Sequence, residues 1–560
     1  MNPRAIKQVL KRNALPKLLL AAALLAGLAC ATAGAQPKPD GPFADSDSPA
    51  AMRDPRMARA MTQQEAAAKA EAETAAALAA AKAAAAAKLL AGEEVLQQRP
   101  VIAPLGAFDA PAPKETRLKN GLRLLVLEKA GAPMEALLFA VRRGSTSDPA
   151  GMAGLAAITT AMLETGSAKK SQAQMAEIAD ALGATLRTGA TSDGSMVSVA
   201  AQPEKLKAMV ALLAEVTLKP NFDPAEWKKL QAQRVAQLEQ QLAEPRVAAQ
   251  HAFANAVYAG QPLGHVATGT PASVKTLALE DVKSLWSGID PGEVAVIAVG
   301  GAPEAAVVAA LSAKFGNWKR SAKPRGEAVA GSKPAGEKGG APGAAPDAPS
   351  RPRLVFVDFP GRPQSVLRVG QPSVPLASPD QLALRVLNSV LGGSFTSRLN
   401  QNLREKNGYS YGAGSTFAFG RGPGPFAAAT SVKTEVTGLA LGELLKEVER
   451  AVKEPLSAEE LEKGKALLAY QLVEELQSSG QTAGLLGELF LGDVPMEELK
   501  TMVPRLKALT VAEVEAAAQR ALAPGSMTIV IAGDAKTVLP QLEPLKLPAA
   551  ERRGATGEKL

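Results

Sequence analysis

Residues 291–301 read PGEVAVIAVGG, and residues 524–534 read PGSMTIVIAGD. Each stretch starts with a Pro-Gly pair, which is typical of a turn, and continues into a run of small and β-branched apolar residues. A short apolar run bounded by turn residues predicts a buried strand. The two stretches lie 233 positions apart, which suggests that a larger unit is repeated.

Two further pairs of segments keep nearly the same spacing. FDPAEWKKLQAQRVAQLEQQL (222–242) matches LSAEELEKGKALLAYQLVEEL (456–476) at an offset of 234, and LALEDV (277–282) matches LTVAEV (509–514) at 232. Chance matches would not hold register across elements of different type. The sequence therefore predicts two homologous domains.

Each half begins with a strand-like run, LRLLVL at 122–127 and LVFV at 354–357, and then continues with long amphipathic helices. Strands grouped apart from helices favour an α+β fold, with a mainly antiparallel sheet and helices packed on one face. We expect the two domains at 112–320 and 351–540, followed by a tail at 541–560.

Two stretches of low complexity flank the first domain. Residues 36–111 form a linker that holds an alanine-rich helix at 62–91, which we interpret as a solvated spacer because its apolar face consists mostly of methyl groups. Residues 321–350 are rich in Pro, Gly and Ala and cannot form a core.

Residues 1–35 have the form of a secretory signal peptide. A basic segment precedes the apolar run 18–29, and Ala33-Gly34-Ala35 offers a cleavage site. The run is too short to span a membrane. Cys30, the single cysteine, is either a small apolar residue of this signal or the lipid anchor of a membrane-attached lipoprotein. Both readings predict an exported protein, which would be periplasmic in the first case and a membrane-anchored lipoprotein in the second.

Composition supports a globular chain with more than one core, since 46% of the 560 residues are hydrophobic and 21% are charged. The formal net charge is +8, but 1–35 contributes five basic residues and no acidic one, which leaves +3. With only 4% aromatic residues, nothing indicates a nucleic-acid partner.

Three motifs resemble those of the pitrilysin/insulinase-type metallopeptidases (inverzincins), a family that includes the mitochondrial processing peptidases and the bc1 core proteins. The motifs are RLKNGLRLLVLEK (117–129), RRGSTSDPAGMAGLA (142–156) and LGGSFTSRLNQNLREKNGYSYG (391–412). The resemblance covers nearly all of 112–540, and it implies two domains that together form one half of a clamshell.

The family's zinc motif is H-x-x-E-H on a helix. In the segment GMAGLAAITTAMLET (151–165), the family register places Ala157 and Ala161 at the histidine positions and Thr160 at the glutamate. Alanine cannot coordinate a metal, and threonine is no general base at neutral pH. Glu239 lies near the position of the third ligand, but a single carboxylate would not hold zinc, so we interpret it as a solvated helix residue.

Other residues offer no replacement for this motif. His251 and His265 are 14 positions apart with Pro262 and Gly264 between them, so they share no helix face. No serine–glycine elbow accompanies either histidine, which argues against Ser–His catalysis. We expect no metal on this chain and zinc on a partner subunit.

The second half retains residues that the family uses for substrate binding. The resemblance assigns Arg404 and Tyr411, with Tyr409 as the alternative, to hydrogen bonding with the substrate across the cavity. The alternative is an ordinary surface arginine and a packed tyrosine. Gly392 and Gly393 would let the backbone approach a bound peptide, or they form a simple turn.

These features predict a non-catalytic, substrate-binding subunit of a heterodimeric zinc peptidase. It would be inactive alone, would pair with a homologous zinc-bearing chain, and would bind unfolded peptides. The alternative is a peptide-binding or assembly scaffold like the bc1 core proteins. A third hypothesis, an autonomous hydrolase, would require other catalytic residues.

Overall fold

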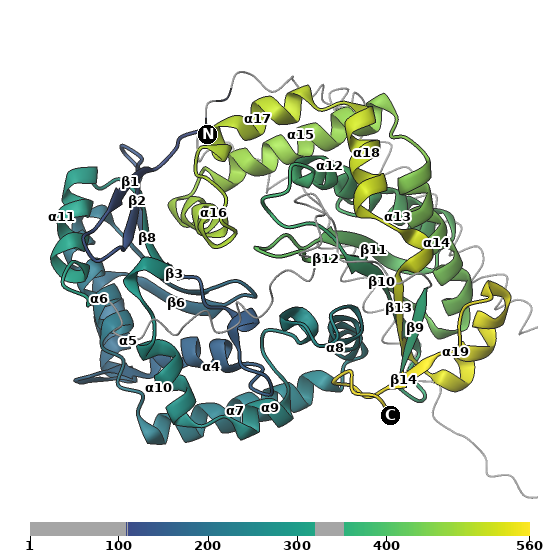
Figure 1. The fold of residues 1–560 in the computed structure, drawn as a ribbon, viewed down its shortest axis with the longest axis horizontal. Helices are drawn as coiled ribbons and strands as arrows, with labels where there is room; N and C mark the ends of the chain where they lie inside the picture. The colour runs from purple at the N-terminus through teal and green to yellow at the C-terminus, as the bar shows by residue number, and fades with distance from the viewer. Residues whose placement is uncertain (1–107, 109, 320–351) are drawn as a thin grey trace, which may run out of the picture. The chain divides into compact units, whose positions relative to one another are not determined.

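A computed structural model describes residues 108, 110–319 and 352–560. Several sequence predictions lie outside these residues: the signal peptide at 1–35 with Cys30, the alanine-rich helix at 62–91, and the linker at 321–350. The predicted domain boundaries therefore stay predictions. Figure 1 shows how the described helices and strands are arranged.

The first domain contains a six-stranded sheet and a set of helices. Its strands are β1 (Lys114–Arg117), β2 (Arg123–Glu128), β3 (Glu135–Val141), β6 (Thr185–Ala190), β7 (Ser195–Ala201) and β8 (Val294–Gly300), with the short pair β4 (Gly166–Ser167) and β5 (Lys170–Ser171) apart from the sheet. Its helices are α4 (Leu155–Met162), α5 (Gln172–Leu182), α6 (Leu206–Leu218), α7 (Pro224–Leu242), α8 (Pro245–Val257), α9 (Pro271–Thr276), α10 (Leu279–Ser287) and α11 (Glu304–Phe315).

The second domain repeats this plan. Its strands are β9 (Arg353–Asp358), β10 (Gln364–Pro372), β11 (Ser410–Phe417), β12 (Pro425–Lys433), β13 (Thr528–Gly533) and β14 (Glu551–Arg553). Its helices are α12 (Gln381–Leu391), α13 (Arg398–Asn400), α14 (Thr437–Lys453), α15 (Ala458–Glu475), α16 (Ser479–Leu491), α17 (Glu498–Ala508), α18 (Val511–Ala521) and α19 (Ala535–Leu542).

The two sheets have related topologies. The strand order is β1-β2-β8-β3-β7-β6 in the first and β11-β12-β10-β13-β9-β14 in the second. Most neighbours are antiparallel, while β2 with β8 and β9 with both β13 and β14 are parallel. The predicted α+β fold with mainly antiparallel sheets is therefore confirmed. The three repeated sequence segments fall on equivalent elements, namely β8 and β13, α7 and α15, and α10 and α18.

The repeated apolar strands are buried on both faces. In β8, Val294, Val296 and Ala298 belong to a core with the first domain's own helices, whereas Ala295, Ile297 and Val299 belong to a second cluster. A strand covered on both sides needs apolar residues at every position. This is the physical reason for the continuous apolar run at 294–299.

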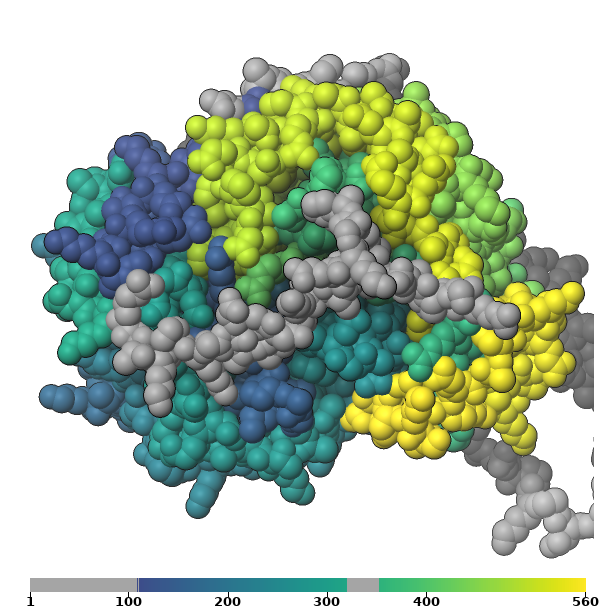
Figure 2. Space-filling model, in the orientation of Figure 1, coloured from purple at the N-terminus to yellow at the C-terminus, as the bar shows by residue number. Residues whose placement is uncertain are grey.

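The second face of each sheet is covered by a helix from the other domain. Helix α16 packs on β3 and β8 of the first sheet, and α8 packs on β9, β10 and β13 of the second (Figure 1). In Figure 2 the yellow-green surface that includes α16 borders the purple N-terminal strands. The helices α8 and α16 occupy equivalent places in the two domains, because they follow the equivalent helices α7 and α15, so each domain lends one helix to the other. The sequence predicted helices on one face of each sheet, and these exchanged helices cover the second face.

The expected tail at 541–560 includes a strand. Strand β14 pairs in parallel with β9 at the edge of the second sheet. Arg553 is 3% exposed, and its guanidinium donates a hydrogen bond to the carbonyl oxygen of Gly557 at 2.6 Å. These contacts attach the C-terminal segment to the domain.

Candidate functional site

Helix α4 is held in place by residues that precede it. Gly154, directly before the helix, has φ = 96°, and a Cβ there would lie 2.8 Å from the carbonyl oxygen of Thr268. The Asp148 carboxylate accepts hydrogen bonds from the backbone N–H groups of Gly154 and Ala156, both at 2.9 Å. Burial raises the pKa of Asp148 to about 7. The Asp148 carboxylate thus fixes the helix N-terminus through backbone N–H groups alone. The helix can therefore keep its position without metal-binding side chains.

The three zinc-motif positions carry side chains that do not fit zinc. Ala157 and Ala161 are half-buried and lie one turn apart on α4. The buried Thr160 hydroxyl donates hydrogen bonds to the carbonyl oxygens of Ala157 at 2.9 Å and Ala156 at 3.2 Å. Zinc requires nitrogen, sulfur or oxygen ligands aimed at one point. Two methyl groups and a hydroxyl bonded to its own helix do not supply them.

The remaining candidate ligands are not assembled either. Glu239 is exposed on α7. His251 is buried on α8, where burial lowers its pKa, and His265 lies in a loop with Nδ1 3.1 Å from the carbonyl oxygen of Val266. Within the described ranges, no group of three His, Cys, Asp or Glu side chains is arranged to hold a metal ion.

Arg404 lies at the surface of the second domain, in the π-helical turn Gln401–Lys406. Its Nε atom is 3.3 Å from the Glu405 carboxylate, and its guanidinium carbon lies 4.6 Å from the centroid of the Phe395 ring. Phe395 is 68% exposed. Sequence reasoning missed Phe395, for which the signal would have been a large apolar residue within the polar run S-F-T-S. Together the guanidinium and the ring form an exposed cation–π pair.

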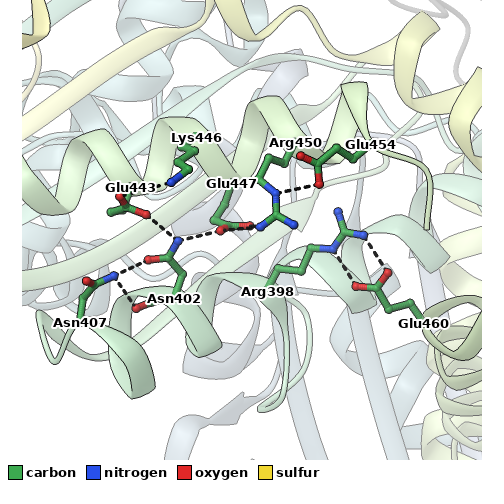
Figure 3. A network of polar contacts seen from close by, with 9 residues as sticks. All are labelled: Arg398, Asn402, Asn407, Glu443, Lys446, Glu447, Arg450, Glu454 and Glu460. Atoms are coloured by element: carbon green, nitrogen blue, oxygen red, sulfur yellow. Dashed lines mark hydrogen bonds and ion pairs between the residues drawn. The ribbon is translucent and has the colours of Figure 1, made fainter. Parts of the chain in front are cut away.

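A buried polar network fixes the turn that carries Arg404 (Figure 3). The Asn402 Nδ2 group donates hydrogen bonds to the carboxylates of Glu443 and Glu447, both at 2.7 Å. Its Oδ1 atom accepts one from Asn407 Nδ2 at 2.6 Å, and the Asn407 backbone N–H donates to the Asn402 carbonyl oxygen five residues earlier. This i→i−5 bond produces the wide π turn.

A bulge in β11 exposes Tyr411. Ser410 lies opposite Val432, whereas Ala413 lies opposite Thr430. Strand β11 therefore has one more residue than β12 between these two pairs. Tyr411 falls within this irregularity and is 91% exposed. Bulges redirect side chains in this way.

Tyr409, the alternative to Tyr411, is partly buried against the core of the second domain. Its backbone N–H donates a hydrogen bond to the carbonyl oxygen of Leu403 at 2.8 Å. The structure therefore brings Arg404, with Phe395, and Tyr411 to the surface on elements that pack together. Tyr409 instead serves the packing beneath them.

Gly392 and Gly393 are required by packing inside the domain. A Cβ on Gly392 would lie 2.2 Å from the backbone nitrogen of Ser415 in β11, and one on Gly393 would lie 2.8 Å from Asn388 Nδ2. The Gly393 N–H donates a hydrogen bond to the carbonyl oxygen of Asn388 at 2.7 Å. These contacts let the end of α12 approach β11 closely, and contact with a peptide stays a prediction.

The fold and this site define a two-domain, peptidase-like chain. Its helix α4, which carries the three zinc-motif positions, has no metal-binding side chains there. Residues 124–270 match the family description "Insulinase (Peptidase family M16)", and residues 289–468 match "Peptidase M16 inactive domain". The chain belongs to the pitrilysin/insulinase family, peptidase family M16. The resemblance drawn from the sequence motifs is confirmed.

Relatives and solved structures agree with this assignment. The chain is 23% identical over 422 residues to an uncharacterized zinc protease of Mycobacterium tuberculosis, a match that covers 75% of this chain and 93% of that protein. It is similar to a peptidase M16 inactive domain from Pseudomonas fluorescens, with a TM-score of 0.66, 25% identity, and coverage of 75% of this chain and 98% of the other.

Two further solved structures share the fold. A protease from Helicobacter pylori has a TM-score of 0.68 at 19% identity, and the match covers 76% of this chain and 100% of that protein's chain. The periplasmic protease PqqL from Escherichia coli has a TM-score of 0.61 at 16% identity, and the match covers 80% of this chain and 50% of that protein's chain. Across the described residues, no helix has the length and apolar character to cross a membrane.

Proposed function

We propose that this chain is the substrate-binding, non-catalytic subunit of an exported zinc peptidase that works as a heterodimer. A homologous partner with an intact H-x-x-E-H motif would hold the zinc and carry out hydrolysis. The proposal is supported by the contrast between the two halves of this chain. The first keeps the helix frame without metal-binding side chains, whereas the second presents Arg404 and Tyr411 to solvent.

The exposure of Tyr411 carries the proposal. A phenol that is 91% exposed on a bulge gains nothing from packing within its own domain. On the π-helical turn that packs against β11, Arg404 is held by the Phe395 ring and by the buried hydrogen bonds of Asn402. Phenol and guanidinium groups both donate hydrogen bonds, so they would bind and orient a peptide carbonyl and stabilise negative charge that develops on its oxygen.

Export is supported by the signal-like residues 1–35 and by the fold shared with the periplasmic PqqL. The protein would therefore act in the periplasm, in free form or attached through a lipid on Cys30. The first experiment is to isolate the full chain from the periplasm with its bound proteins. A homologous partner that contains H-x-x-E-H is the expected result.

The decisive measurement is peptide hydrolysis by that complex. Arg404→Ala and Tyr411→Phe should each lower kcat/KM by about 10²-fold, by analogy with the loss of one transition-state hydrogen-bond donor. Tyr470→Phe, which removes a phenol elsewhere in the same domain, should change nothing. Full activity of the Arg404→Ala, Tyr411→Phe double variant would refute the proposal. An unrelated partner would instead favour an assembly scaffold, and hydrolysis by the metal-stripped chain alone would favour an autonomous enzyme.

A further inference from the structure

A cavity of about 430 Å³ lies in the second domain among α12, α13, the π-helical turn, α14 and α15. It is separate from the zinc-motif helix of the first domain, and the proposed function does not use it. Its charged lining residues are Arg398, Lys406, Glu447, Arg450, Glu460 and Lys463. Four cations therefore face two carboxylates.

Both carboxylates are already engaged by protein donors (Figure 3). Glu460 accepts hydrogen bonds from Arg398 Nε and Nη2, both at 2.7 Å. The buried Glu447 accepts one from Asn402 at 2.7 Å and pairs with Arg450 at 3.0 Å. The bidentate contact with Glu460 fixes the Arg398 guanidinium. Arg450 is held from two sides, because its Nε atom also donates to the Glu454 carboxylate at 2.9 Å. The carboxylates thus position the two arginines at the wall of the cavity.

Three donor groups in this wall lack an acceptor of opposite charge. Arg398 Nη1 is buried without a hydrogen-bond partner, and in Figure 3 it points away from Glu460. Among the described residues, Lys406 has no ion-pair partner, and Lys463 contacts only the hydroxyl of Thr396. A buried donor that makes no hydrogen bond costs free energy of folding, so an acceptor is expected for it. The three groups come from α13, the π-helical turn and α15.

We propose that this cavity binds the dianionic phosphate group of a small molecule. Three donors on separate elements match the three terminal oxygens of a phosphate, whereas a carboxylate offers two oxygens and one charge. Two lysines without a carboxylate partner among the described residues, Lys406 and Lys463, supply two positive charges to match its two negative charges. The volume falls in the range of small-molecule sites and leaves room for an organic group beyond the phosphate. Lys406 is two residues from Arg404 in the same turn, so the ligand would contact the element that presents Arg404.

Calorimetric titration of the full chain with inorganic phosphate and with a nucleoside monophosphate tests this proposal. We expect saturable binding of one equivalent, weakened about tenfold by Lys406→Ala and by Lys463→Ala. Both lysines are exposed, so their replacement should leave the fold intact, which circular dichroism would verify. Tighter binding of the ester would identify an organic phosphate as the ligand, and equal binding would identify free phosphate.

Lys500→Ala is the matched control, because this lysine is exposed on α17 and does not line the cavity. It removes the same charge and should leave phosphate affinity unchanged. Absence of binding by either phosphate compound would overturn the proposal. An equal loss of affinity in the Lys500→Ala variant would also overturn it, since it would reveal unspecific attraction to a basic surface. So would an acidic peptide that binds this site while phosphate does not.

Discussion

The guanidinium of Arg142, at the end of the first domain's strand β3, lies 4.4 Å from the ring centroid of Phe490 on helix α16 of the second domain. The same guanidinium donates hydrogen bonds to the Phe490 carbonyl oxygen at 2.9 and 3.2 Å. The reciprocal contact joins Arg368 of the second sheet to Phe253 on α8, at 4.9 Å. Each exchanged helix thus brings a buried aromatic ring to an arginine of the other domain.

Phe490→Ala should therefore destabilise the protein by about 3–5 kcal/mol, because the ring is 1% exposed in the cluster between α16 and the first sheet. Phe490→Leu should cost about 1.5 kcal/mol, since it keeps most of the volume. Both variants retain the carbonyl that Arg142 binds. Denaturant unfolding measures the difference. A change below about 1 kcal/mol in the alanine variant, within the usual range of surface substitutions, would show that this contact is not needed to hold the exchanged helix.

Gly392→Ala should destabilise the second domain by about 1–3 kcal/mol, because the new methyl would lie 2.2 Å from the Ser415 nitrogen. Gly484→Ala is the matched control. Gly484 is exposed within α16, and a new methyl there would meet no atom within 4 Å other than those of its own helix backbone and chain neighbours. Alanine there should therefore add up to about 1 kcal/mol of stability. Thermal unfolding of both variants compares the two. Equal stability of Gly392→Ala and the natural chain would contradict the close approach of α12 to β11.

Glu135 makes stability depend on pH. It is 1% exposed in β3, and its carboxylate accepts a hydrogen bond from the Ala302 N–H at 3.0 Å. Burial raises its pKa from 4.5 to about 7. Since the folded pKa exceeds the unfolded one, the folded state retains the proton more strongly. The associated stability is complete below pH 4.5 and is lost as the pH rises through about 7.

Glu135→Gln should remove this loss while keeping an acceptor for Ala302. Above pH 7 the variant should gain up to about 3 kcal/mol relative to the natural chain, compared with their difference at acidic pH. Urea unfolding at pH 5 and pH 8, on either side of most of the transition, measures this change. Asp148, whose pKa burial also raises to about 7, should still produce pH dependence in the variant. Parallel pH profiles for the two proteins would rule out a titrating Glu135.

Asn402→Asp should destabilise the π-helical turn by about 3 kcal/mol at neutral pH. The substitution removes the two hydrogen bonds to Glu443 and Glu447 and places a third carboxylate beside theirs. Neighbouring negative charge raises the pKa of the introduced group, so acidification should restore much of the stability. Gln401→Glu adds a charge at an exposed position of the same turn and should cost little. A loss that does not diminish between pH 7 and pH 4 would contradict this electrostatic cause.

The sequence predicted the parts of the fold that follow from local pattern. The strand expected at 122–127 is β2 at 123–128, and the strand expected at 354–357 lies within β9 at 353–358. Repeats at a constant offset predicted two related domains. The pattern could not reveal the helix exchange, because a run such as VAVIAV specifies burial on both faces but not which helix covers each face.

The candidate site was predictable to a smaller extent. Family motifs located Arg404 and Tyr411, but their presentation depends on a π turn and a bulge. These arise from Asn402 bonding Glu443 and Glu447, far along the chain, and from the register between β11 and β12. Phe395 became a candidate only when the fold placed its ring against Arg404. The phosphate cavity also required the fold, since its charged residues lie on four separate elements.

By itself, the sequence determined that two homologous α+β domains form and that Ala157, Thr160 and Ala161 supply no zinc ligands, because residue chemistry and apolar periodicity suffice for both. Only the tertiary structure decided that α8 and α16 exchange domains, that Tyr411 is exposed, and that Arg398 Nη1 lacks an acceptor. Each of these depends on contacts between residues distant in the chain. Such contacts are set by how complete sheets and helices pack, and no local pattern encodes them.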